Sequence, residues 1–192
     1  GVYNDINPLL QELRRSGPDV IFNLAESFSF KRENEPHIPA ILELAGVPYT
    51  GCAPLAIHLC KDKSLAKKLL SYHRIRVPQF TVSRKAHPLR SLKRFPYPAF
   101  VKPLDLEASE GISQGSLAET EKECLERVHY LHGKLGSSVM IEEFIDGREI
   151  YASLLGNEKV HVLPPREFFF GEIPPGGPRF ATFHAKWDES YR

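Results

Sequence analysis

The sequence predicts a protein that mixes helices and strands, α/β in its first third and α+β in the remainder. Up to about residue 60, apolar segments with little alternation, typical of strands in a parallel sheet, follow helical periodicities. From residue 76 to residue 170, strands also follow one another directly, which indicates antiparallel pairing. The composition, with 42% hydrophobic and 26% charged residues in 192, is typical of a soluble globular protein with a buried core.

The first third is expected to alternate helix and strand. The expected elements are a helix from Asn7-Pro8 to Gly17-Pro18, a buried strand at 19–24, a helix from Pro36 or Pro39 to Gly46, and a short strand or turn at 47–51. Asparagine suits an N-cap and proline the first helical position, while glycine commonly ends a helix. This order favours α/β, and we place a domain boundary near Cys60.

The remainder is expected to combine two longer helices with several strands. The expected elements are a mostly helical segment at 55–74, an extended segment at 77–82, a short helix at 88–94, a strand at 97–103, a loop at 104–114, a helix from 116 to about 135, a strand that begins with Val139-Met-Ile141, a strand at 149–155, and strands at 160–163, 167–170 and 180–183. Ser116-Leu-Ala-Glu119 fits a capping box, which predicts the start of the second long helix.

Charge and cysteine usage exclude several classes of protein. The formal net charge is +1, so neither nucleic acid nor an anionic membrane is expected as a partner. No apolar run is long enough to span a bilayer, and no signal peptide opens the chain. Cys52, Cys60 and Cys124 are odd in number and scattered, which favours buried thiols in a reducing cytoplasm over a disulfide frame or a zinc site.

The stretch from Val139 to Leu155 is a candidate binding element. A strand ends in two acids, and an apolar pair, a turn at Asp146-Gly147 and a second strand follow. Such an arrangement could hold a flat heterocycle, with the hinge backbone at the ring edge and the acids accepting from amino and hydroxyl groups. The alternative is an ordinary hairpin with solvated acids, and this stretch alone favours it.

Isolated lysines and histidines leave two interpretations open. Lys102 ends a strand before a Ser/Gly loop, and Lys63 lies near a helix start, so either could neutralise phosphate. For each lysine taken alone, a solvated side chain is the commoner case. His129 and His132 are three apart on one helix and could share a metal, but surface histidines are favoured because no third ligand is near in sequence.

Four stretches together carry a family resemblance. They are Leu42-Glu-Leu-Ala-Gly-Val-Pro-Tyr-Thr-Gly51, Lys61-Asp-Lys63, Phe100-Val-Lys-Pro103 and Ile141-Glu-Glu-Phe-Ile-Asp-Gly-Arg-Glu149. In this order and spacing the chain resembles the ATP-grasp superfamily, and within it the D-alanine–D-alanine ligase family. The resemblance implies the end of an N-terminal, Rossmann-like domain at residues 1–60, a central ATP-binding subdomain at 61–147 and the beginning of a C-terminal subdomain at 148–192.

The resemblance also implies roles for individual residues. Lys63 and Lys102 would contact ATP phosphates, and Glu142 would accept from the adenine amino group. Glu143, Phe144 and Ile145 would form the hinge around the ring, and Glu149 would bind the ribose hydroxyls. The loop with Ser109, Glu110 and Gly111 would cover the phosphates. Lys186 would lie on the mobile loop that closes over the reacting groups, so Lys186 and Ser109 are the expected catalytic residues.

The implied activity is the joining of a carboxylate to an amine through an acyl phosphate, with ATP and Mg²⁺, in cytoplasmic peptidoglycan biosynthesis. The expected partners are ATP and small amino-acid or carboxylate substrates, with a homodimer as one option for assembly. The chain is expected to be a fragment, inactive by itself, whose magnesium ligands would follow Arg192. Leu106-Glu-Ala-Ser-Glu-Gly111 departs from the family's Glu-Gly-Ser-Ser-x-Gly, which leaves a nucleotide-binding protein with lost or altered ligase activity as the alternative.

Overall fold

The computed structural model describes residues 2–169, 180 and 182. The chain divides into two compact units, residues 1–66 and residues 67–192. Helix α4 (Lys63–Tyr72) begins in the first unit and continues into the second. The domain boundaries expected at residues 60 and 147 stay a prediction. Within the described residues, every helix is too short or too polar to cross a membrane.

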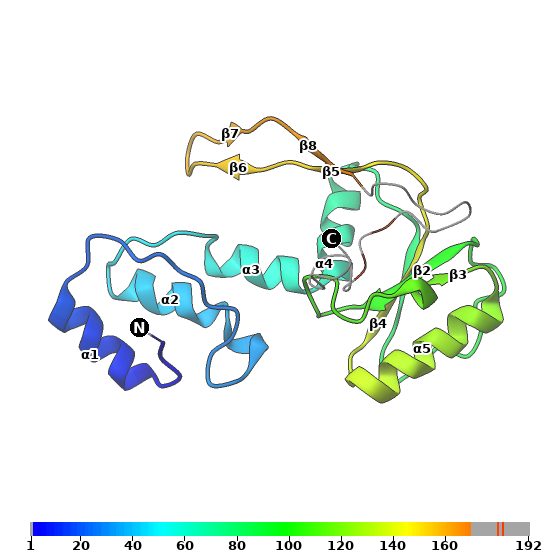
Figure 1. Cartoon of the computed structure of the whole chain (residues 1–192), viewed down its shortest axis with the longest axis horizontal. Helices are drawn as coiled ribbons and strands as arrows, with labels where there is room; N and C mark the ends of the chain where they lie inside the picture. The colour runs from blue at the N-terminus through cyan, green and yellow to red at the C-terminus, as the bar shows by residue number, and fades with distance from the viewer. Residues whose placement is uncertain (1, 170–179, 181, 183–192) are drawn as a thin grey trace. The chain divides into compact units, whose positions relative to one another are not determined.

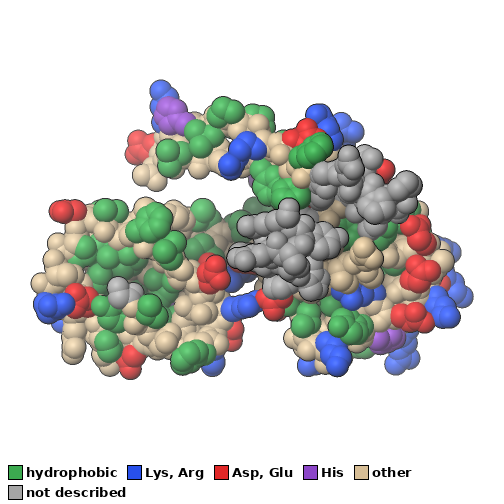
Figure 2. Space-filling view, viewed as in Figure 1, with side chains coloured by type: hydrophobic (Ala, Val, Ile, Leu, Met, Phe, Trp, Pro, Cys, Tyr) green, Lys and Arg blue, Asp and Glu red, His purple; other side chains and the backbone are tan. Residues whose placement is uncertain are grey.

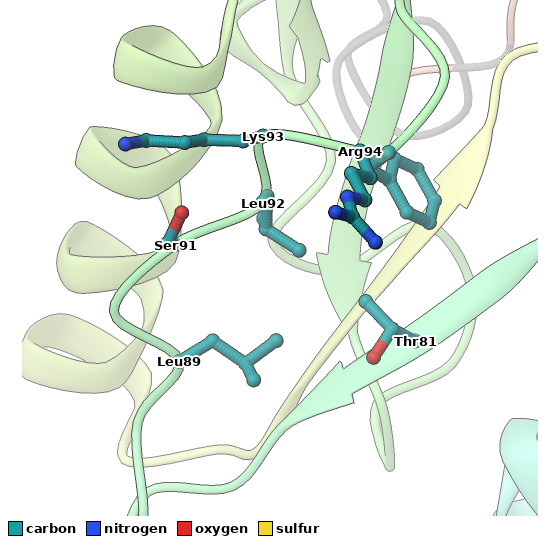
Figure 3. Close-up of a pocket in the computed structure, with 7 residues that line it drawn as sticks. Thr81, Leu89, Ser91, Leu92, Lys93 and Arg94 are labelled. Atoms are coloured by element: carbon teal, nitrogen blue, oxygen red, sulfur yellow. The ribbon is translucent and has the colours of Figure 1, made fainter.

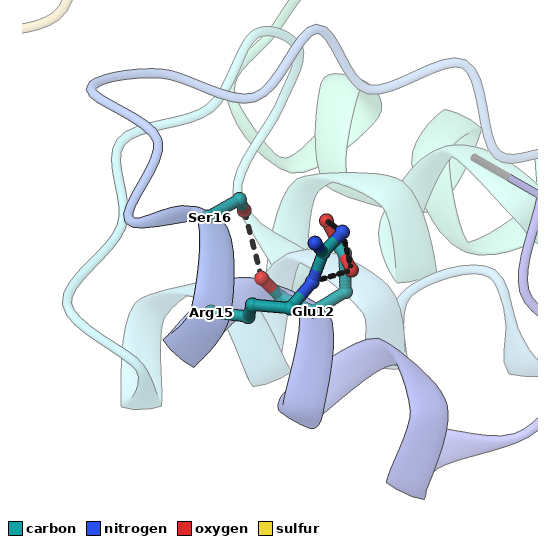
Figure 4. A network of polar contacts seen from close by, with 3 residues as sticks. All are labelled: Glu12, Arg15 and Ser16. Carbon is teal, nitrogen blue, oxygen red and sulfur yellow. Dashed lines mark hydrogen bonds and ion pairs between the residues drawn. The ribbon is translucent and has the colours of Figure 1, made fainter.

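The N-terminal unit is mainly helical. It contains α1 (Ile6–Ser16), a 3-10 turn η1 (Arg32–Asn34), α2 (His37–Leu44) and α3 (Pro54–Lys61). Its core is formed by the buried side chains of Leu13, Ile38 and Leu42. The exposed side of α1 carries an ion pair between Arg15 and Glu12 at 2.7 Å (Figure 4). Exposed pairs at this spacing add only about 0.3–0.5 kcal/mol, so the leucine and isoleucine core stabilises the unit.

Two expectations for the N-terminal unit were wrong. Helix α1 begins at Ile6 with Asp5 as its N-cap, because the Asp5 carboxylate accepts from the N–H of Asn7 at 2.8 Å. Residues 19–24 do not form a buried strand. Among the described residues, this segment makes one parallel bridge, between Ile21 and Tyr49, and Phe22 is 74% exposed.

The C-terminal unit is built on a four-stranded antiparallel sheet in the order β1-β4-β2-β3. The strands are β1 (Phe80–Ser83), β2 (Ala99–Pro103), β3 (Leu117–Ala118) and β4 (Val139–Glu143). A 3-10 turn η2 (Gln114–Ser116) precedes β3, and α5 (Glu121–Leu135) covers one face of the sheet (Figure 1). The mixture of helices with antiparallel strands confirms the expected α+β class.

Two antiparallel ribbons follow the sheet. They pair β5 (Glu149–Tyr151) with β8 (Arg166–Phe168) and β6 (Leu154–Leu155) with β7 (His161–Val162). Exposed hydrophobic side chains lie on the second ribbon, where Leu154, Leu155 and Val162 are each at least 65% exposed (Figure 2). The hairpin alternative is wrong, because β4 pairs with β1 and β2 whereas β5 pairs with β8.

Three further boundaries differ from the predictions. Residues 88–94 are irregular and form no helix. The Glu121 carboxylate accepts from the hydroxyl of Ser91 and the N–H of Leu92, so these donors have a partner outside any helix. Helix α5 is capped by Thr120, which accepts from the N–H of Glu123, and residues 117–118 form β3 instead. The strand expected at 149–155 is divided into β5 and β6, which pair with different strands.

Candidate functional site

The four-stranded sheet has two faces with different roles. Ala99, Val101, Val139 and Ile141 point toward α5 and form the core with buried residues of that helix. Successive side chains of a strand point to opposite faces. The residues between them, Phe100 and Lys102 on β2 and Met140 and Glu142 on β4, therefore lie on the face away from α5. The alternation of side chains along β2 and β4 thus places core residues on one face of the sheet and candidate site residues on the other.

Two lysines bind one carboxylate on this open face. The Lys102 ammonium donates a short hydrogen bond to one oxygen of Glu142, and the Lys67 ammonium lies 2.9 Å from the other. The side chains of Lys67, Glu142 and Lys102 are only 15%, 10% and 19% exposed. With two cations and one anion, this cluster carries a formal charge of +1 in a partly desolvated place. It can therefore accept an additional anion.

An aromatic cluster lies beside the charged cluster. The ring of Phe100 is roughly parallel to that of Phe144 at 6.2 Å and meets the edge of Phe180 at 4.8 Å. These rings, together with Lys102 and Glu142, line a cavity of about 380 Å³. It is lined by Pro78, Phe100, Lys102, Ser109, Ile112, Glu142, Glu143, Phe144, Ile145, Gly147, Arg148, Glu149 and Phe180. A cavity that combines aromatic and aliphatic walls with charged side chains suits a flat ring that carries an anionic group.

Backbone hydrogen bonds fix the hinge after β4. The N–H of Glu143 donates to the carbonyl of Gln79 at 2.8 Å, and the N–H of Phe144 donates to the carbonyl of Pro98 at 3.0 Å. The Glu143 carboxylate accepts from the N–H of Gln79 at 3.3 Å. The end of β4 is thus held from both neighbouring strands, so the ring of Phe144 keeps its place at the cavity wall.

The loop at 104–114 reaches the same cavity. Ser109 lines it, and the backbones of Ala108 and Ser109 have φ of 52° and 64°. A left-handed backbone conformation costs of order 1–3 kcal/mol in a non-glycine residue, and such residues occur preferentially at functional sites. Arg127 of α5 holds the end of this loop, because its guanidinium donates to the carbonyl of Gly111 at 2.7 Å. Burial lowers the pKa of Arg127.

The structure brings most of the predicted site residues together. Seven predicted site residues line this cavity: Lys102, Ser109, Glu142, Glu143, Phe144, Ile145 and Glu149. Gly111, near the end of this loop, is closely packed, because a Cβ atom there would lie 2.7 Å from Pro103. Lys63 is the first residue of α4 and belongs to the N-terminal unit. Lys186 lies outside the described residues, so its role stays a prediction.

Sequence reasoning missed three contributors to this site. Phe100 and Phe180 form its aromatic wall, and Lys67, for which the sequence predicted no role, lies 2.9 Å from Glu142. The spacing of Phe100 and Lys102 by two residues in a strand was an available signal, since it places both on one face. Nothing local in the sequence indicates that Lys67 meets Glu142.

The histidine pair does not form a metal site. His132 lies 3.0 Å from the hydroxyl of buried Ser83 and 3.0 Å from the carbonyl of Ser137, so both ring nitrogens are engaged, and His129 is exposed. Within the described part of the chain, no group of three or more His, Cys, Asp or Glu side chains could hold a metal ion.

A second cavity, of about 460 Å³, opens on the other side of β1. Figure 3 shows Leu89, Ser91 and Leu92 on the irregular segment, and Thr81 on β1. Its charged residues, Lys93 and Arg94, are exposed. The smaller cavity remains the candidate site because its charged groups are desolvated and paired.

The antiparallel sheet, the covering helix and the nucleotide-sized cavity on its open face define an ATP-grasp protein. The solved VanG D-Ala:D-Ser ligase from Enterococcus faecalis has this fold, with a TM-score of 0.62 and 27% identity over 78% of this chain and 43% of that one. The family model described as D-ala D-ala ligase C-terminus matches residues 61–190, and the chain belongs to that family. The resemblance noted in the sequence is thereby confirmed.

Curated relatives agree with this assignment. The chain is 38% identical over 159 residues to the uncharacterized protein y4sG of Sinorhizobium fredii, which covers 83% of this chain and 45% of the relative. It is 34% identical over 160 residues to a D-alanine--D-alanine ligase of Caldicellulosiruptor bescii, over 78% of this chain and 41% of the relative. The chain therefore spans less than half the length of these relatives.

Proposed function

We propose that the protein functions as an ATP-dependent carboxylate–amine ligase and that this chain supplies the nucleotide half of the site. The observation that carries the proposal is the cluster of Lys102, Glu142 and Lys67 at the end of an aromatic cavity. A purine fits between apolar side chains, and phosphate suits the net positive end. Family membership supports the same reaction class.

Each lining residue has a distinct role in this proposal. Lys102 neutralises an ATP phosphate, and Glu142 accepts from the adenine amino group. Glu143, Phe144 and Ile145 hold the ring, and Glu149 accepts from the ribose hydroxyls. Ser109, in the strained loop, donates to a phosphate oxygen, and packing of Gly111 against Pro103 supports that loop.

Other parts of the proposal rest on the family. Lys63 is a second phosphate contact, and Lys186 acts at the reacting groups. A substrate carboxylate attacks the terminal phosphorus of ATP and ADP leaves; the amine of a second substrate then attacks the acyl carbon and phosphate leaves. D-Alanine is the proposed substrate of both steps, since the relative from C. bescii is named for it. The dipeptide would serve peptidoglycan synthesis in the cytoplasm.

Magnesium belongs to the proposed reaction because a divalent cation offsets the charge of the phosphate oxygens. We assign it no protein ligand among the described residues, where metal-binding clusters of three or more His, Cys, Asp or Glu are absent.

The test is calorimetric titration of the 192-residue chain with ATP, with and without magnesium. Lys102→Met should weaken ATP binding by about tenfold or more, because a charge-assisted phosphate contact contributes about 1.5–3 kcal/mol. Lys122→Met is the matched control, since the Lys122 side chain on α5 is 85% exposed and outside the cavity. Equal affinities of the two variants would contradict the proposal. Release of ADP with D-alanine, measured on a protein that contains the complete site, then separates a ligase from a protein that only binds nucleotide.

A further inference from the structure

We infer that Lys67 is a positioning residue of the nucleotide site, which pairs with the Glu142 carboxylate and holds it in place when Lys102 turns to phosphate. The inference rests on the proposed function and deepens it. The roles of Lys102 and Glu142 are those that the family resemblance implies, whereas the role of Lys67 follows from its contact with the Glu142 carboxylate at 2.9 Å.

Lys67 reaches Glu142 from outside the cavity. Lys102 and Glu142 line the cavity, whereas Lys67, on α4, is not among its lining residues. Its ammonium also lies 5.7 Å from the centre of the Phe80 ring. Phe80 pairs with Glu142 across β1 and β4, so its ring occupies the same face of the sheet and shields this ion pair. A residue so placed contacts ATP only through Glu142.

The two lysines cannot be equivalent once ATP is bound. A phosphate at the cavity end competes with Glu142 for the ammonium of Lys102. If Lys102 were the only partner, its departure would leave a carboxylate that is 10% exposed without a counter-charge, which is costly. Lys67 removes this cost, because it stays on the second carboxylate oxygen. Lys102 is therefore available to phosphate only because Lys67 is present.

The orientation of Glu142 follows from the same contact. A carboxylate with one oxygen in an ion pair with Lys67 leaves the other for the cavity, where the adenine amino group would donate to it. In the structure that second oxygen accepts from Lys102. A carboxylate oxygen can accept from more than one donor, so the adenine amino group adds to this oxygen, and only the phosphate of ATP draws Lys102 away. The contact with Lys67 is kept.

The experiment compares ATP with adenosine, which has no phosphate, in calorimetric titrations of the full 192-residue chain. Lys67→Met should weaken ATP binding about tenfold or more and adenosine binding less than about threefold, because adenosine leaves Lys102 on Glu142. A merely structural role would weaken both ligands equally. Lys68→Met is the matched control, since Lys68 is the next residue of α4 and is exposed.

A second background makes the result specific. In Glu142→Gln the side chain is neutral, so adding Lys67→Met should cost little further ATP affinity. A loss that persists in this background, or equal ATP affinity of Lys67→Met and the unsubstituted chain, would overturn the inference and leave the proposed function intact. Failure of the unsubstituted chain to bind ATP would overturn both.

Discussion

Glu121 shows how one side chain can replace a secondary-structure element. Its carboxylate accepts from the N–H of Leu92 at 2.6 Å and from the hydroxyl of Ser91 at 2.8 Å. These hydrogen bonds, the backbone one first, lower the pKa of Glu121. A glutamate with a lowered folded-state pKa stabilises the protein above its unfolded pKa, and this contribution disappears as the pH falls through the folded value.

We therefore expect Glu121→Gln to destabilise the C-terminal unit near pH 7, and the difference from the unsubstituted chain to shrink below about pH 4. Urea unfolding of both proteins across this pH range measures it. Glu126→Gln, on the same helix with a 66% exposed side chain, should show a much smaller difference. A deficit of Glu121→Gln that is independent of pH would contradict the role assigned to its charge.

The loop at 104–114 depends on close packing. Gly111 has φ of 73°, and a Cβ atom there would lie 2.7 Å from Pro103 and 2.8 Å from Leu135. Gly111→Ala should therefore lower the free energy of unfolding by about 1–3 kcal/mol. Gly133→Ala is the control, because Gly133 lies inside α5 with open space around its Cα and alanine favours helix by about 1 kcal/mol. Thermal melting should move in opposite directions for the two variants, and a fall for both would refute the packing argument.

The elements that local pattern specifies were predicted well. The strands near 97–103 and 139–143 and the C-terminal ends of α1 and α5 agree with the predictions, because apolar runs and the helix stop at Gly17-Pro18 are local signals. The short helix at 88–94 was wrong because Glu121, about thirty positions away, determines that segment.

The candidate site was predictable only in part, for the same reason. The acids, the hinge and Lys102 have recognisable spacing along the chain, and the structure gathers them around one cavity. The partner of Glu142 on α4 depends on long-range packing around the central sheet. Such contacts leave no periodic trace, since the residues between them can vary in number and kind.

Each compact unit has its own apolar core. Leu42 is 1% exposed in the N-terminal unit, and Val128 is fully buried in the C-terminal unit. Leu42→Ala should cost about 2–5 kcal/mol and speed amide exchange in α2, while amides of α5 keep their protection. Val128→Ala should give the reverse pattern in hydrogen exchange followed by mass spectrometry. Equal acceleration in both helices for either variant would show that the two cores unfold as one.

Strand β4 carries a constraint on how this protein can evolve. Ile141 belongs to the core and Glu142 to the charged cluster, and they are neighbours in the chain. Deleting or inserting one residue early in β4 would exchange their faces, placing a carboxylate against α5 and an isoleucine between two lysines. Point substitutions can alter the chemistry and the core separately. Changes in length within this strand cannot, so we expect lineages to vary in the flanking loops instead.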